Sequence, residues 1–213
     1  MPSESEAIGY WNDVADEKNF TFPVDIDLLT SHLDTDHRIF DLGCGYGRVT
    51  SLMQGRGFTD VTGFDPAPAM IERGRNTDSA LDLRVWRGER LPVEDESIDG
   101  VLLVGVLSCI PDDHEQIRLL NEVRRVLKND GYVYISDIPI QHTERYQRRY
   151  SEFSDDDYAY GTFRLPDGGL LRHLKPSRFE ELLGGLDLLH RRRNETTSMH
   201  GNPVDIFDFL GRA

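Results

Sequence analysis

From residue 37 the sequence alternates short apolar runs with longer amphipathic segments, and few folds accommodate this rhythm. The runs typical of β-strands lie at 38–42, 60–65, 83–88, 98–107 and 132–138. Helical patterns lie between them at 49–57, 67–75 and 112–128. Strands that alternate with helices form βαβ units, and continuous apolar runs are typical of strands buried on both faces. The sequence therefore predicts an α/β fold, a doubly wound and mostly parallel sheet with helices on both faces.

The region 139–176 is polar and aromatic and breaks this alternation. Residues 160–174 have the pattern of a β-hairpin, because the sequence PDGG near their centre supplies a turn. The earlier pattern then returns, with a helix at 175–186 and strands at 187–197 and 203–213. We therefore interpret 139–176 as an insertion that covers the substrate region.

The length of 213 residues suits a single domain with one sizeable core. Residues 1–36 precede the alternating pattern and have helical character. The predicted organisation is an N-terminal helical cap over residues 1–36, followed by one domain over residues 37–213 that contains the insertion.

The charge of the chain argues against one broad class of partner. Asp and Glu total 38 residues against 24 Lys and Arg, which gives a formal net charge of −14. A protein that grips nucleic acid through its phosphates needs a basic face, and the basic clusters here are as short as Arg191–Arg193. We therefore expect no nucleic-acid partner.

The sequence carries no membrane or export signal. No apolar run approaches the roughly 20 residues that a membrane helix needs, and the N-terminus, MPSESEAIGYWND, is acidic and polar. The two cysteines, Cys44 and Cys109, have neither metal-ligand spacing nor a CxxC partner. These features predict a cytoplasmic protein without a membrane partner and without a cluster of metal-ligating residues.

A glycine-rich segment follows the first predicted strand. The sequence DLGCGYGR contains the pattern D-x-G-x-G-x-G, formed by Asp41, Gly43, Gly45 and Gly47. In an open parallel sheet, ligands bind beyond the carboxyl ends of the strands, where glycine lets the backbone approach them closely. The helix expected to follow offers free N–H groups, which favour an anionic or carboxylate-bearing ligand.

Two phosphate-binding motifs fit this segment poorly. A dinucleotide motif, G-x-G-x-x-G, needs a third glycine where the sequence has Arg48, and the Gly-Lys-Ser/Thr of a P-loop is absent. Asp41 would also repel a pyrophosphate and attract an ammonium group. Asp65 ends the second predicted strand, where an acid can accept both hydroxyls of a ribose. The expected ligand has a ribose and a cationic or zwitterionic tail, without a pyrophosphate.

Several longer segments share the order and spacing of one enzyme family. They are IFDLGCGYGR, VTGFDPAPAMIERGR, RGERLPVEDESIDGVLLVGVLSCIPD and LLNEVRRVLKNDGYVYISD, within residues 37–138. As a set they resemble the class I S-adenosylmethionine-dependent methyltransferases, and most closely the branch that methylates small molecules. YWNDVADEKNFTFP resembles the helix that caps the cofactor in many of these enzymes. The resemblance implies a Rossmann-like, seven-stranded sheet with an antiparallel last strand, S-adenosylmethionine as cofactor and S-adenosylhomocysteine as product.

The resemblance also implies roles for individual residues. Asp41 and the loop glycines would lie against the amino-acid end of the cofactor, and Asp65 would hold its ribose. Gly105 and Val106 would face the methionine part. The residues expected to bind the cofactor are Tyr10, Lys18, Asp41, Gly43, Cys44, Gly45, Gly47, Asp65, Pro66, Met70, Gly88, Glu89, Gly105 and Val106.

One position departs from the family pattern. Many relatives carry an aspartate five residues before the proline of the LP sequence, where it receives the adenine amino group, and here that position is Arg87. An arginine cannot accept a hydrogen bond. Either Glu89, next to Gly88, takes over this role, or the adenine is held by backbone and stacking alone.

Methyl transfer from a sulfonium is an in-line displacement that needs alignment, exclusion of water and in some cases removal of a proton. Histidine titrates near neutral pH, so the candidate general bases are His114, His142 and His173. We rank His114 and His142 as the catalytic candidates, because one opens the long helix after the fourth strand and the other begins the insertion. The predicted function is methyl transfer to a small-molecule acceptor. A homodimer is compatible with the sequence.

Three alternatives stay open at this point. A nucleotide-binding oxidoreductase of the NAD type would bind NADH and not S-adenosylmethionine, although Asp41 and Arg48 disfavour it. A non-catalytic S-adenosylmethionine-binding protein would share the same fold. The acceptor would be RNA or protein in the third case, and the net charge of −14 argues against RNA.

Overall fold

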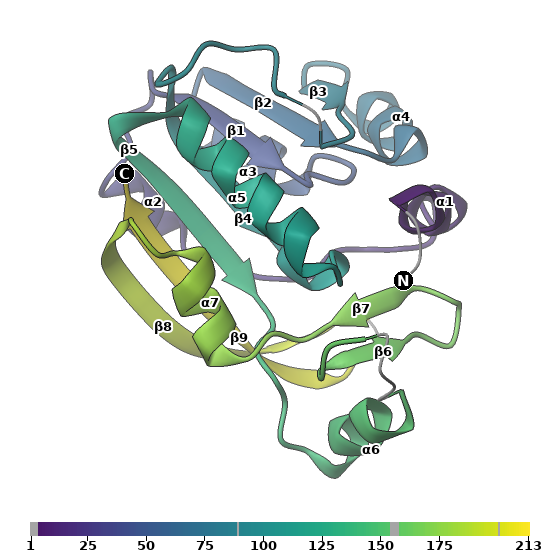
Figure 1. The fold of residues 1–213 in the computed structure, drawn as a ribbon. Coiled ribbons are helices and arrows are strands. Elements are labelled where there is room, and N and C mark those ends of the chain that lie inside the picture. Colours follow the sequence, from purple (N-terminus) through teal and green to yellow (C-terminus); the bar gives the residue numbers. More distant parts are fainter. Residues whose placement is uncertain (1–3, 89, 154–157, 200) are drawn as a thin grey trace.

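A computed structural model describes residues 4–88, 90–153, 158–199 and 201–213. Its centre is a seven-stranded sheet in the order β3-β2-β1-β4-β5-β9-β8 (Figure 1). The strands are β1 Arg38–Leu42, β2 Asp60–Asp65, β3 Asp82–Val85, β4 Ile98–Val104, β5 Leu127–Asp137, β8 Asp187–Thr197 and β9 Pro203–Arg212. Strands β1 to β5 are parallel, and β9 pairs antiparallel with both β5 and β8. The predicted Rossmann-like sheet with an antiparallel last strand is confirmed.

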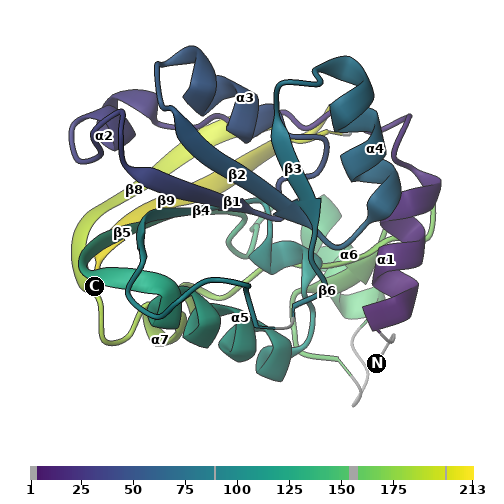
Figure 2. The ribbon, with the colours of Figure 1, turned by 90° about the horizontal axis from the view of Figure 1, so that it is seen from above.

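Helices cover both faces of this sheet, as Figure 2 shows. On one side lie α2 Ile26–Thr30, α3 Arg48–Gly55 and α4 Pro68–Thr77. On the other side lie α5 Asp113–Val126 and α7 Pro176–Leu182. Helices α3, α4 and α5 therefore each return the chain to the amino edge of the sheet, and the loops that lead into them lie together at its carboxyl edge.

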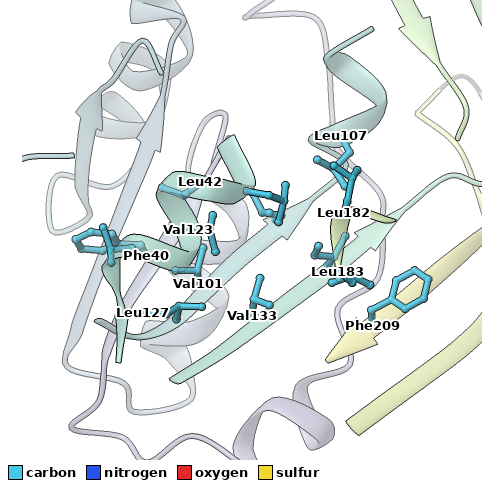
Figure 3. Packing of buried hydrophobic residues seen from close by; sticks show 14 of the residues in the cluster. Phe40, Leu42, Val101, Leu107, Val123, Leu127, Val133, Leu182, Leu183 and Phe209 are labelled. Carbon is cyan, nitrogen blue, oxygen red and sulfur yellow. The ribbon is translucent and has the colours of Figure 1, made fainter. Parts of the chain in front are cut away.

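Clusters of buried hydrophobic residues hold these layers together. The largest lies between the sheet and helices α5 and α7, and Figure 3 shows Val101 and Val133 of the sheet near Val123, Leu182 and Leu183. A second cluster joins β1 and β2 to α2 and α3 on the opposite face. Burial on both faces explains why the central strands are recognisable as continuous apolar runs.

Local signals set the starts of the helices that face the carboxyl edge. Gly47 adopts a left-handed backbone, with φ of +81°, directly before α3. Pro68 occupies the first turn of α4. Asp112 caps α5, because its carboxylate accepts the backbone N–H groups of His114 and Glu115.

The structure corrects some predicted boundaries. The strand expected at 83–88 ends at Val85, and the strand expected at 98–107 ends at Val104. The helix expected to reach residue 128 ends at Val126, because Leu127 already has extended backbone and begins β5. Both shortened strands give way to loops that face the carboxyl edge of the sheet.

The insertion forms a small subassembly near this edge (Figure 1). It contains α6 Glu144–Glu152 and the hairpin of β6 Thr162–Arg164 and β7 Leu170–Arg172. The sequence predicts the hairpin but not α6, whose segment ERYQRRYSE is dominated by charged and polar residues. A bridge between Pro139 and Leu174 closes the insertion at its base. The lead-in contains α1 Glu4–Asp13 in addition to α2.

Across the described ranges, none of the helices combines the length and the apolar character needed to cross a membrane.

Candidate functional site

A cavity of about 290 Å³ lies at the carboxyl edge of the sheet. It extends from the loops after β1, β2 and β4 to α6 and the hairpin of the insertion. The predicted cofactor residues that line it are Asp41, Gly43, Cys44, Gly45, Asp65, Pro66, Met70, Gly88, Gly105 and Val106. Tyr10, Lys18 and Gly47 do not line it, and Glu89 lies outside the described residues.

The glycine loop is fixed by hydrogen bonds to the neighbouring strand. The backbone N–H groups of Gly43 and Cys44 donate to the carbonyl oxygen of Phe64 at 2.7 and 3.0 Å. Gly45 adopts a φ of +57°, and a Cβ at this position would collide with the ring of Phe20. Glycine is therefore required where the loop turns along the cavity wall.

Asp41 is buried at the end of β1 and is held by the first turn of α3. Its Oδ2 atom accepts hydrogen bonds from the backbone N–H and the hydroxyl of Thr50, at 3.0 and 2.8 Å. Burial raises the pKa of Asp41 to about 6, although the bonds from Thr50 and the charge of Arg48 oppose this rise.

Asp65 joins the glycine loop to the start of α4. Its Oδ2 atom accepts the backbone N–H of Gly45 and its Oδ1 atom accepts that of Ala67, both at 2.9 Å. Burial raises the pKa of Asp65 to about 6. Each carboxylate oxygen has a further lone pair, so Asp65 can accept additional hydrogen bonds from a ligand in the cavity.

Together, the two acids give this end of the cavity a preference for positive charge. The charge of Asp65 contributes to the raised pKa of Asp41, and both carboxyl groups line the same space. A cationic ligand would relieve their mutual repulsion and would replace part of the lost solvation. The arrangement favours a ligand that has hydroxyl donors and a cationic group, and it disfavours a pyrophosphate.

Residues beyond Asp65 form a flat and largely apolar part of the wall. Pro66 and Met70 line it as predicted, and Trp86, directly after β3, lines it as well. Arg87 also lines the cavity and is exposed, so no carboxylate occupies this position. The indole of Trp86 favours the second of the two alternatives for an adenine, which is stacking.

The loop after β4 is fixed from behind by a buried acid. Asp137 accepts the backbone N–H of Ser108 at 3.2 Å, and burial raises its pKa. Gly105, with a φ of +71°, begins this loop at the cavity. Burial also raises the pKa values of Cys109 and Cys44, so both side chains are thiols at neutral pH. Their surroundings suit packing rather than nucleophilic chemistry.

The lead-in reaches the cavity through residues other than the predicted ones. Tyr10 and Lys18 bind Asp167 at the tip of the hairpin, the hydroxyl of Tyr10 donating to Oδ1 at 3.2 Å and Lys18 forming an ion pair with Oδ2. The hairpin thus offers these two polar groups a carboxylate partner away from the cavity wall. Trp11 and Phe20 of the same lead-in line the cavity instead.

Arg73 of α4 anchors this lead-in. Its Nη1 atom donates to the carbonyl oxygens of Ala15 and Lys18, both at 2.6 Å, and its Nη2 atom donates to Asn19. The Arg73 guanidinium also lies 4.0 Å from the centre of the Tyr46 ring. These contacts hold the lead-in against the glycine loop and α4.

The structure separates the three candidate histidines. His114 and His142 are exposed and do not line the cavity. His114 lies in the first turn of α5, where its backbone serves the Asp112 cap, and His142 precedes α6. Neither therefore faces the space in which a general base would act. His173 does line the cavity, directly after β7.

One group of potential metal ligands is present, although the sequence predicts none. Side-chain ligand atoms of Asp34, Asp36 and His37 lie within 4.8 Å of one another. The two acids are exposed, and none of these residues lines the cavity. The ring of His37 already contacts Asp34 through both nitrogens, so this group is unconnected with the site described above.

Comparisons with known proteins identify methyltransferases that are similar to this chain. The family described as the methyltransferase domain matches residues 40–135, which contain the glycine loop and Asp65. An uncharacterized methyltransferase of Mycobacterium tuberculosis is 32% identical over 94 residues, which cover 44% of this chain and 37% of that protein. These matches support the resemblance to the class I S-adenosylmethionine-dependent methyltransferases over residues 40–135. The chain spans less than half the length of the first curated methyltransferases that it matches.

Solved methyltransferase structures share the fold. An S-adenosylmethionine-dependent methyltransferase of Methanosarcina mazei matches with a TM-score of 0.82 over 91% of this chain and 98% of that protein, at 23% identity. The 1,6-didemethyltoxoflavin-N1-methyltransferase of Burkholderia thailandensis, solved with its acceptor and S-adenosylhomocysteine, matches with a TM-score of 0.66 at 19% identity, over 98% of this chain and 86% of that protein.

Two residues of the cavity, Trp86 and Arg149, were not identified by sequence reasoning. The position of Trp86 could have been inferred from the sequence, because an aromatic residue that directly follows a parallel strand lies at the carboxyl edge of the sheet. Trp11 and Phe20, which lie in the segment that resembles a cofactor cap, are aromatic residues that the sequence offers as possible pocket walls, and both line the cavity. Arg149, on the unpredicted helix α6, reaches the cavity only through the fold of the insertion.

Proposed function

We propose that this chain is a methyltransferase that moves the methyl group of S-adenosylmethionine to a small-molecule acceptor by in-line displacement. The observation that carries the proposal is one cavity that joins two chemically different walls. The glycine-loop wall contains Asp41 and Asp65, and the insertion wall contains Tyr146 and Phe163. A cofactor on the first wall and an acceptor on the second would share one enclosed space.

The residues of the glycine-loop wall fit S-adenosylmethionine. Asp65 would accept its ribose hydroxyls, and Asp41 would attract its ammonium group. Pro66, Met70 and Trp86 would pack against its adenine. When bound, this cofactor supplies an electrophilic methyl group on a sulfonium and leaves as S-adenosylhomocysteine. Its positive charges suit a wall whose acids are buried and close together.

The contribution of the chain to the reaction is positioning and exclusion of water. Trp11 and Phe20 from the lead-in and Phe163 from the insertion all line the cavity, and Trp11 packs against the cluster that contains Phe163. Holding two reactants in one such space replaces a bimolecular encounter with an oriented one. A nucleophilic acceptor can attack a sulfonium methyl group without a general base. We therefore assign no proton transfer to His114 or His142, because neither side chain lines the cavity.

A small acceptor is supported by the shared cavity and by the charge of the chain. The neighbour from Burkholderia thailandensis holds 1,6-didemethyltoxoflavin as its acceptor within the same fold. The net charge of −14 disfavours an RNA acceptor. The predicted cytoplasmic location and homodimer stay predictions.

The test is transfer of an isotope-labelled methyl group. The protein is incubated with methyl-labelled S-adenosylmethionine and a fractionated extract of cellular small molecules, and the products are separated by mass. We expect label in a low-molecular-weight product together with S-adenosylhomocysteine. The control is the Asp65→Ala variant in the same fractions, which should lose most of this label.

Each alternative gives a different result. Label found in RNA or protein would replace the small-molecule acceptor. Tight binding of S-adenosylmethionine without label transfer in any fraction would favour a non-catalytic binding protein. Binding of NADH in place of S-adenosylmethionine would favour an oxidoreductase and would overturn the proposal.

A further inference from the structure

Arg149 reaches the cavity wall from α6. It is half-buried and lines the cavity. Its guanidinium carbon lies 5.3 Å from the centre of the Phe163 ring and 5.8 Å from that of the Tyr146 ring. Among the residues that the structure describes, no carboxylate forms an ion pair with it. This is unusual in a chain with 38 acidic residues, where the nearby Arg172 shares its charge with Asp113 at 2.7 Å.

His173 lines the same cavity, and its Nδ1 atom is hydrogen-bonded to Tyr150. The backbone N–H of Gln141 donates to the hydroxyl oxygen of Tyr150 at 3.1 Å, and that oxygen lies 2.6 Å from Nδ1 of His173. Because the backbone N–H can only donate, the hydroxyl proton of Tyr150 is available for Nδ1. Donation of this proton to Nδ1 places the proton of the neutral ring on Nε2.

The protonation state of His173 supports the role of a donor. Burial, with a smaller effect from the charge of Arg149, lowers the pKa of His173 to about 3. The ring is therefore neutral at physiological pH. With Nδ1 engaged by Tyr150 and a proton on Nε2, His173 is poorly suited to act as the general base that the sequence suggested.

Both groups contact the ring of Phe163. The ring centre of Phe163 lies 4.8 Å from that of His173, and the Arg149 guanidinium lies over the same Phe163 ring. The rest of this wall is apolar and includes Leu165 and Leu171. Asp41 and Asp65 belong to the glycine-loop wall, and Asp112 and Glu115 line the cavity at the start of α5. The insertion wall therefore combines a cation and a neutral N–H donor with a hydrophobic surface.

We propose that Arg149 and the Nε2–H group of His173 bind a carboxylate of the methyl acceptor, which is therefore an aromatic acid. This inference rests on the proposed function, because only a methyl transfer requires an acceptor. A carboxylate has enough lone pairs to accept from the guanidinium and from Nε2–H together. Its aromatic body would pack against Phe163 and the neighbouring leucines.

The test compares aromatic acids with their uncharged amides. Benzoate and benzamide, and cinnamate and cinnamamide, are titrated into the protein with and without S-adenosylhomocysteine and are followed by protein-observed NMR. The members of each pair have nearly the same shape and differ in charge. We expect each acid to bind at least tenfold more tightly than its amide, which corresponds to about 1.4 kcal/mol.

Variants assign this preference to the two side chains. Arg149→Gln should reduce the preference for the acid to less than about threefold. Arg148→Gln, at the exposed neighbouring position on α6 outside the cavity wall, should keep it. Tyr150→Phe removes the hydrogen bond between the Tyr150 hydroxyl and Nδ1 of His173. Nitrogen NMR of His173 should then show a mixture of the two neutral tautomers, with the proton on Nδ1 or on Nε2. Thermal unfolding of each variant identifies those that fail to fold.

The outcomes separate this inference from the proposed function. Equal affinity for acids and amides, an unchanged preference in Arg149→Gln, or no binding of any probe would overturn the carboxylate site. A native His173 with its proton on Nδ1 would overturn the role of Nε2. Failure of S-adenosylhomocysteine to bind would overturn the proposed function, whatever the probes show.

Discussion

The two walls of the cavity differ in origin and in charge. The glycine-loop wall comes from β1, β2 and the loops after them, and it contains Arg48 and the two acids Asp41 and Asp65, both with pKa values raised to about 6. The insertion wall comes from α6 and the hairpin, and its polar groups are Arg149 and His173. The first wall suits a cationic cofactor and the second suits an anionic acceptor. One enclosed space can thus sort two ligands by their charge.

The two walls also differ in how their polar groups are fixed. Asp65 is held by backbone N–H groups at the ends of regular elements. His173 is held by the side chain of Tyr150, which itself depends on the backbone of Gln141. The glycine-loop wall should therefore tolerate little change in its backbone, while the insertion wall should respond to changes in single side chains.

The largest effect is expected from Gly45→Val. A β-branched residue at a φ of +57° is strained, and its Cβ would collide with Phe20. The variant should also displace the N–H that Gly45 donates to Asp65. We expect about a 100-fold loss of S-adenosylmethionine affinity, or about 2.7 kcal/mol, by calorimetry.

Gly55→Ala is the matched control. Gly55 ends α3, and a Cβ there would meet no atom within 4 Å. This variant should keep the native affinity and should gain up to about 1 kcal/mol in the free energy of unfolding. Native affinity in Gly45→Val would show that the backbone of the glycine loop is not what shapes the cofactor wall.

A change in pH should affect the acidic wall next most strongly. As the pH falls through about 6, Asp41 and Asp65 become protonated and lose their attraction for a cation. We expect S-adenosylmethionine affinity to fall at least about tenfold between about pH 7 and about pH 5. Asp41→Asn should flatten this profile, and a flat native profile would contradict the charge assigned to this wall.

The same two acids should change the stability of the ligand-free protein in the opposite direction. Their pKa values in the folded state lie above the ordinary value of 3.8. Their contribution to the free energy of unfolding is therefore fully present below about pH 4 and is lost as the pH rises through about 6. Thermal unfolding of native protein and of Asp41→Asn across this range isolates the contribution of Asp41.

A smaller effect is expected from Thr50→Val, which removes one donor from Asp41. The hydroxyl of Thr50 lies 2.8 Å from Oδ2 of Asp41, and its loss should raise the pKa of Asp41 further. We expect about a threefold loss of S-adenosylmethionine affinity at neutral pH, because one hydrogen bond contributes about 1 kcal/mol. Thr59→Val, at an exposed position away from the cavity, should have no effect.

The smallest effect on affinity is expected from Lys18→Met, which breaks the ion pair between the lead-in and the hairpin. Such pairs contribute about 0 to 1 kcal/mol, so cofactor affinity should change about twofold or less. Hydrogen exchange of α1 should nevertheless become faster. Arg90→Gln, which breaks the more exposed pair with Asp95, should leave exchange in α1 unchanged. Unchanged exchange in both variants would show that Lys18 does not hold the lead-in.

The glycine-loop wall could be predicted from the sequence because its signals are local. Strand patterns place Asp41 and Asp65 at the ends of β1 and β2, and the glycines mark the turn between β1 and α3. The pairing of β1 with both β2 and β4 then brings the loops together at one edge. Trp86 is the main residue of this wall that the sequence did not identify, and it lies at the cavity because it directly follows β3.

The insertion wall could not be predicted in the same way. Tyr146 and Tyr150 are the buried side chains of α6, and they are four residues apart, as on one face of a helix. Because the other residues of this segment are mostly charged or polar, the sequence does not show this helical spacing clearly. Tyr150 meets His173 only because the chain returns through β7. Ranking histidines by their distance along the chain from predicted strands therefore favoured His114 and His142 over His173.

The most direct test of the account is calorimetric titration of the native protein, Asp65→Ala and Asp60→Ala with S-adenosylmethionine, S-adenosylhomocysteine and NADH. Asp60 lies at the opposite, exposed end of the same strand, 3.7 Å from Arg38. We predict that S-adenosylmethionine and S-adenosylhomocysteine bind the native protein and Asp60→Ala with similar affinity. Their affinity for Asp65→Ala should be at least tenfold weaker, which corresponds to about 1.4 kcal/mol. Binding of NADH alone, or equal affinity in both variants, would contradict the account.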